Sequence, residues 1–114
     1  MGKRLKVYIA GPYSKGDVAE NVRNAIFAGN LVAHFGHIPF IPHLTHFWHM
    51  LAPNDYEFWM DQDEQWLREC DAIIRLDGES SGADREMALA RELGLRVLGS
   101  VFDLTPGIYK EEGD

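Results

Sequence analysis

The segment DAIIRLDGESSGADREMALARELGLRVLGSV, residues 71–101, carries the pattern that decides the fold. An apolar run is followed by a polar loop, an amphipathic helix and a second apolar run, an order typical of one unit of a parallel sheet. Ser81, three residues before Asp84, has the spacing of a helix cap, and Gly94 ends the helix. The segment therefore predicts a strand at Asp71–Leu76, a loop at Gly78–Ser81, a helix at Asp84–Gly94 and a strand at Leu95–Val101.

Strands and helices also alternate in the preceding residues. The two prolines of the second apolar run favour an edge position for that strand. The expected elements are strands at Leu5–Ala10 and Ile38–Pro42, a helix at Val18–Phe35 capped by Asp17, a loop or short helix at His43–Pro53, and a helix at Asp55–Glu69 that a capping box of Asn54 and Glu57 begins.

This order of elements predicts the fold class. We expect residues 1–104 to form one α/β domain, a flavodoxin-like (Rossmann-like) fold of three layers with a parallel sheet of four or five strands. Residues 105–114 are expected as a polar C-terminal tail. In such folds the ligand binds beyond the carboxyl ends of the strands, which places the loops after the first and third strands at the site.

The composition of the 114 residues argues against several classes of protein. A formal net charge of −7 argues against a nucleic-acid polymer as partner, because phosphate binding requires clustered Lys and Arg. No run approaches the roughly 20 apolar residues of a membrane span, and we recognise no signal peptide. The only cysteine, Cys70, cannot form an internal disulfide, so we expect a cytoplasmic protein.

Two carboxylates occupy helix positions that should face the core. On a helical wheel Glu86 lies in the middle of an apolar stripe with Ala90, and Asp63 lies in another with Trp59 and Trp66. A capping or ion-paired acid would explain either one alone, but two buried acids predict a working pair. We expect the helix N-terminus to keep Glu86 charged and desolvation to keep Asp63 protonated. Such a division suits a nucleophile that attacks and an acid that protonates a leaving group.

Two loops are candidates for binding an anion. The Gly11–Asp17 loop has two glycines and a serine but matches neither a P-loop nor a dinucleotide fingerprint, so an ordinary turn explains it equally well. Ser80, Ser81 and Gly82 offer two hydroxyls and open amides at a helix start, and they form the better phosphate site.

Aromatic and histidine side chains fill the segment before the second long helix. His43, His46 and His49 follow a three-residue spacing, but no cysteine accompanies them, and we assign no metal. Recognition of a base edge and a surface or structural role are both open for them. Trp59 fits the core or a stacking platform for a base, and Tyr8 fits the core or a contact to a carboxylate.

Three segments together resemble the nucleoside 2-deoxyribosyltransferase superfamily, and within it the 2′-deoxynucleoside 5′-monophosphate N-glycosidases. They are Tyr8-Ile-Ala-Gly11, Gln62–Asp71 and Ser80-x-Gly-x-x-x-Glu86, and the resemblance covers about residues 7–97. It implies that Glu86 is the nucleophile, that Asp63 assists departure of the base, and that Tyr8 supports the glutamate.

One position of this resemblance concerns the phosphate. Ser80 stands where the monophosphate hydrolases have a phosphate-binding serine and the transferases an aspartate. Where those hydrolases have an arginine this chain has Ser14, and the adjacent Lys15 would serve as a point charge.

The resemblance implies hydrolysis of the N-glycosidic bond of a (2′-deoxy)nucleoside 5′-monophosphate through a glycosyl-glutamate intermediate, without metal or organic cofactor. It also implies a homodimer or higher homo-oligomer with shared active sites. A deoxyribosyltransferase that exchanges bases and a non-catalytic nucleotide-binding module are the alternatives. The expected substrate contacts are Gly11, Tyr13, Ser14, Lys15, Ser80, Ser81 and Gly82 around the phosphate and His43, His46 and Trp59 around the base.

Overall fold

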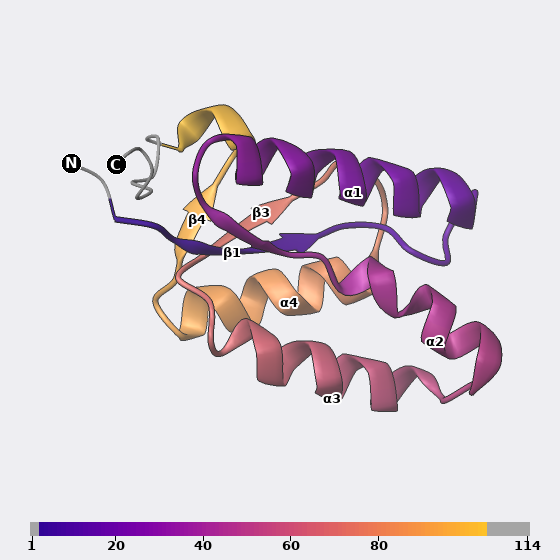
Figure 1. The fold of residues 1–114 in the computed structure, drawn as a ribbon. Helices are drawn as coiled ribbons and strands as arrows, with labels where there is room; N and C mark the ends of the chain where they lie inside the picture. Colours follow the sequence, from indigo (N-terminus) through magenta and orange to yellow (C-terminus); the bar gives the residue numbers. More distant parts are fainter. Residues whose placement is uncertain (1–2, 105–114) are drawn as a thin grey trace.

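The computed structural model describes residues 3–104, which form a parallel sheet with helices on both faces (Figure 1). Among residues 3–104 the strand order, β2-β1-β3-β4, is the flavodoxin-like order without the outermost fifth strand. The predicted α/β class with a parallel sheet of four or five strands is therefore confirmed, and the described sheet has four. The tail predicted at 105–114 lies outside the described residues. The strands are β1 (Lys6–Ala10), β2 (Ile38–Phe40), β3 (Ala72–Arg75) and β4 (Arg96–Leu98).

The helices form the two outer layers. In Figure 1, α1 lies on one side of the sheet, α3 and α4 lie on the other, and α2 leads into the first turn of α3. Within residues 3–104, none of these helices is long and apolar enough to cross a membrane. The helical elements are α1 (Val18–His34), the 3₁₀ turn η1 (Pro42–Thr45), α2 (His46–Leu51), α3 (Tyr56–Leu67), α4 (Ser81–Glu92) and the 3₁₀ turn η2 (Val101–Asp103).

The central strands β1 and β3 send alternate side chains to opposite faces. Val7, Ile9 and Ile74 belong to the buried cluster that includes α1 residues. Tyr8 and Ile73 belong to the second cluster, which includes residues of α3 and α4. Tyr8 is therefore fully buried on the face of the sheet that α4 covers.

Two helices begin with a cap one residue away from the predicted one. Asp55, and not Asn54, caps α3, and Ser80, and not Ser81, caps α4. In each case the side-chain oxygen accepts the free amide three residues later, so a polar cap was predicted correctly and its position was not. The predicted capping box is also wrong, because the Asn54 amide bonds His49 Nδ1 and not Glu57.

The edge strands are shorter than predicted. β2 ends at Phe40 because η1 begins at Pro42. β4 ends at Leu98 because Ser100 caps η2, which replaces the last part of the predicted strand. The central pair, β1 and β3, supports the residues described next.

Candidate active site

A cavity of about 440 Å³ lies at the carboxyl ends of β1 and β3. The strand order changes direction between these strands, and this is where flavodoxin-like folds bind their ligands. Three parts of the chain line the cavity: the turn after β1, the segment from η1 to α3, and the loop and first turns that follow β3.

Glu86 and Asp63 line this cavity from two different helices. Glu86, in the second turn of α4, is only 5% exposed, as its place on the helical wheel predicted. Asp63, in the middle of α3, is partly buried. Two acids from different helices thus line the same cavity.

Tyr8 donates a hydrogen bond from its hydroxyl to Glu86 Oε2 at 2.8 Å. Its ring stacks on Phe40, with ring centroids 5.5 Å apart. Burial and the neighbouring Glu86 raise the pKa of Tyr8 well above its ordinary value, so the hydroxyl keeps its proton and acts as a donor. The predicted contact between Tyr8 and a carboxylate is present.

Burial raises the pKa of both acids. The pKa of Glu86 rises to about 8, although the hydrogen bond from Tyr8 acts in the opposite direction. The pKa of Asp63 rises to about 7 for the same reason. The expectation that Glu86 stays charged at neutral pH is therefore wrong, because loss of water outweighs the favourable position near the start of a helix. The expected direction for Asp63 is confirmed.

The start of α4 presents backbone amides to the cavity. Ser80 Oγ accepts the amide of Ala83 at 3.0 Å, while the amides of Ser81 and Gly82 make no hydrogen bond within residues 3–104. Both residues line the cavity. Two free N–H groups at the positive end of a helix are suited to hold an anion.

Lys15 faces this helix start from the turn after β1. Its Nζ lies 3.5 Å from Glu79 Oε2, and both side chains are largely exposed. Gly11, Tyr13 and Ser14 of the same turn also line the cavity. Among the described residues, Lys15 is the only Lys or Arg that lines it.

The three histidines do not act alike. His43 lines the cavity and is buried, and burial lowers its pKa. Its Nε2 donates to the carbonyls of Gly11 and Pro12 at 3.2 and 3.0 Å. His46 does not line the cavity, contrary to the expected substrate contact, and its Nδ1 instead lies 2.7 Å from the hydroxyl of Tyr13.

His49 and Tyr56, which were not among the expected substrate contacts, line the cavity as well. His49 Nδ1 accepts a hydrogen bond from Trp59 Nε1 at 2.9 Å, which leaves its Nε2 as a donor. A Cβ atom on Gly82 would lie 3.5 Å from the Tyr56 hydroxyl, so this hydroxyl stands over the first turn of α4. Tyr56 is the first residue of α3, and its position is a usable signal because helices of such folds begin at the carboxyl edge of the sheet.

Comparison with known proteins agrees with this architecture. Among solved structures, a 2-deoxyribosyltransferase from the psychrotolerant bacterium Bacillus psychrosaccharolyticus is similar, with a TM-score of 0.62 and 20% identity over 81% of this chain and 69% of that one. At this identity the likeness shows a shared fold. No curated protein matches the sequence. The family described as "Domain of unknown function (DUF7768)" matches residues 5–99, and the chain therefore belongs to this family.

Proposed function

We propose that the protein cleaves the N-glycosidic bond of a nucleoside 5′-monophosphate, preferably the 2′-deoxy form. The observation that carries this proposal is the pair of acids in one cavity, with Glu86 held by Tyr8 at 2.8 Å and Asp63 facing it from α3. The cavity of about 440 Å³ is large enough for a nucleotide. The fold shared with a 2-deoxyribosyltransferase supports the same chemistry.

The reaction proceeds in two displacements at the anomeric carbon. First, the Glu86 carboxylate forms a bond to this carbon, the bond to the base nitrogen breaks, and Asp63 gives its proton to the departing base. Water then attacks the same carbon, the ester bond to Glu86 breaks, and the proton of the water passes to Asp63. The sugar phosphate leaves with its anomeric configuration retained.

The phosphate is held at the start of α4. Its oxygens accept the free amides of Ser81 and Gly82 and face the hydroxyl of Ser80, and Lys15 supplies the positive charge. The base then lies toward Trp59 and the histidine-containing side of the cavity. This orientation places the sugar between the two acids.

A panel of ribo- and deoxyribonucleoside monophosphates tests the proposal. Wild type should release free base from at least one of them, and Glu86→Ala should lower the rate by about a thousandfold or more. Glu92→Ala removes an exposed acid from the other end of the same helix and serves as the matched control. Equal release by wild type and Glu86→Ala would remove Glu86 from the mechanism, and no release from any substrate would favour the nucleotide-binding module.

The same assay with a second free base decides between hydrolysis and transfer. A hydrolase gives sugar phosphate whether or not the second base is present. A deoxyribosyltransferase, the activity named for the similar solved structure, converts the second base into a new nucleoside or nucleotide.

A further inference from the structure

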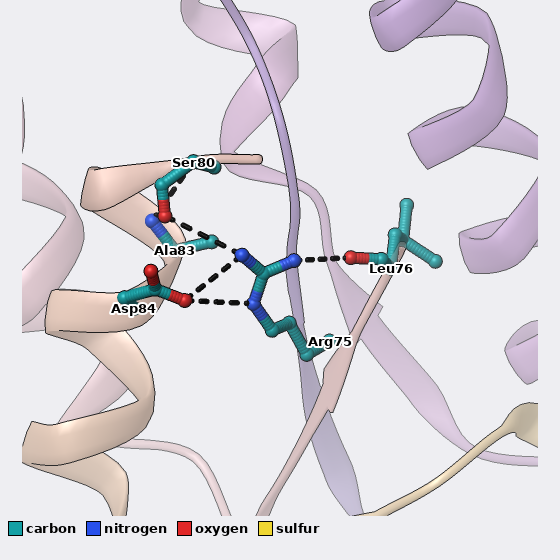
Figure 2. Close-up of polar contacts among 5 residues, drawn as sticks. All are labelled: Arg75, Leu76, Ser80, Ala83 and Asp84. Carbon is teal, nitrogen blue, oxygen red and sulfur yellow. Dashed lines mark hydrogen bonds and ion pairs between the residues drawn. The ribbon is translucent and has the colours of Figure 1, made fainter. Parts of the chain in front are cut away.

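Arg75 occupies the end of β3 and reaches the start of α4 without lining the cavity. Figure 2 shows its guanidinium between three groups. Nε and Nη2 donate to Asp84 Oδ1 at 3.2 and 2.9 Å, Nη1 donates to the carbonyl of Leu76, and Nη2 also donates to the carbonyl of Ser80 at 3.4 Å. One side chain, 22% exposed, thus joins both ends of the β3–α4 loop to the first turn of α4.

The contact with the Ser80 carbonyl adds to the hydrogen bond that this carbonyl accepts from the Asp84 amide at 3.0 Å, and together they hold a peptide group at the cavity. In a trans peptide the C=O and N–H bonds point in opposite directions, and the chain has no cis peptide bond among residues 3–104. A Ser80 carbonyl turned toward Arg75 therefore directs the Ser81 N–H away from Arg75. Ser81 lines the cavity, and its amide is one of the two that make no hydrogen bond within the described residues.

We propose that Arg75 is a positioning residue, which sets the β3–α4 loop so that the Ser81 and Gly82 amides bind the phosphate of the substrate. The identity of this substrate rests on the proposed function above. In this proposal Arg75 is not a ligand of the phosphate, because its guanidinium forms an ion pair with Asp84 at 2.9 Å. A planar guanidinium donates hydrogen bonds to a carboxylate and two carbonyls in fixed directions. A lysine ammonium cannot reproduce this arrangement.

A comparison of two substrates distinguishes a role of Arg75 in phosphate binding from a purely structural role. We would measure kcat/KM for a nucleoside 5′-monophosphate and for the same nucleoside without phosphate, in wild type, Arg75→Gln and Arg75→Lys. Arg23→Gln is the matched control, because Arg23 pairs with Glu20 on the exposed side of α1 and its loss changes the net charge equally.

The preference for the monophosphate should fall about tenfold in Arg75→Gln, mainly through KM, and by less in Arg75→Lys. It should stay unchanged in Arg23→Gln. Equal losses for both substrates would show that Arg75 only supports the fold or Glu86, and this result would overturn the proposal.

A titration with inorganic phosphate makes the test independent of turnover. In ¹⁵N-labelled wild type, the amide signals of Ser81 and Gly82 should shift and saturate, and Arg75→Gln should need about tenfold more phosphate. These shifts in a protein that releases no base would refute the proposed reaction and support the role of Arg75. Absence of the shifts in wild type, or equal affinity in Arg75→Gln, would overturn that role. Should Arg75→Gln fail to fold by circular dichroism, Arg75→Lys carries the same comparison.

Discussion

Replacing Tyr8 by Phe removes one hydroxyl and should make Glu86 harder to ionise. The phenyl ring keeps its place against Phe40, so the change is confined to the hydrogen bond of 2.8 Å. A hydrogen bond to a charged acceptor contributes about 1.5–3 kcal/mol, which corresponds to about 1–2 pKa units. The bond favours the ionised carboxylate, so its loss should raise the pKa of Glu86 from about 8 to about 9–10.

The expected kinetic signature is a deficit that depends on pH. In the proposed mechanism attack requires an ionised Glu86, so each added pKa unit should lower kcat/KM about tenfold below the pKa of this group. At pH 7 we therefore expect Tyr8→Phe to be about 10- to 100-fold slower than wild type. Above the raised pKa both proteins carry an ionised Glu86, and their rates should converge.

Base release measured between about pH 5 and 10.5 checks this expectation. Tyr13→Phe is the matched control, because the Tyr13 hydroxyl also lies at the cavity but bonds His46 and not Glu86. A deficit of the same size at every pH would show that Tyr8 orients Glu86 without affecting its ionisation. An unchanged rate would remove Tyr8 from the site.

Three further predictions concern the charged groups of the cavity. The folded-state pKa of Glu86 is about 8 against an ordinary 4.5, so wild type should lose stability relative to Glu86→Gln as pH rises between these values. Urea unfolding should find the two alike near pH 4 and Glu86→Gln more stable above pH 8, by up to about 5 kcal/mol. Asp63→Asn should slow base release from a natural nucleotide by about 10²–10⁴-fold, but much less for a substrate whose leaving group needs no proton; equal losses for both would remove Asp63 as the acid. Glu79→Gln should free Lys15 from its ion pair of 3.5 Å and lower KM for the monophosphate up to about fivefold, without changing KM for the nucleoside.

The sequence predicted the fold and the acid pair because both depend on periodicity. Apolar residues at helical spacing identified the buried side of α4, and Glu86 lies within it at 5% exposure. The same wheel placed Trp66 beside Asp63 in an apolar stripe, yet Trp66 is 54% exposed. Trp66 lies near the end of α3, where its ring stacks on Phe40 of the edge strand at 5.5 Å, and a wheel has no information about where a helix overhangs its sheet.

Periodicity also fails where the type of helix changes. His43, His46 and His49 are evenly spaced in sequence, but His43 belongs to the 3₁₀ turn η1 and the other two to α2. The rotation per residue differs between the two types of helix, so equal spacing does not give one face. The consequence is that His43 and His49 line the cavity and His46 does not.

Arg75 illustrates a different obstacle, since its partners are mostly backbone carbonyls that every residue possesses. Its one charged partner, Asp84, lies nine positions away in another element. From the sequence, a basic residue at the carboxyl end of a strand would be interpreted as a direct phosphate ligand. In the structure its guanidinium forms an ion pair with Asp84. The described cavity lining holds the acidic side chains of Asp63, Glu79 and Glu86 and a single ammonium group, that of Lys15. With one cationic side chain in this lining, the proposed binding of a phosphate would depend on correctly oriented amides at the start of α4. If the protein acts as proposed, its choice between nucleotide and nucleoside should therefore depend on how firmly Arg75 holds that loop.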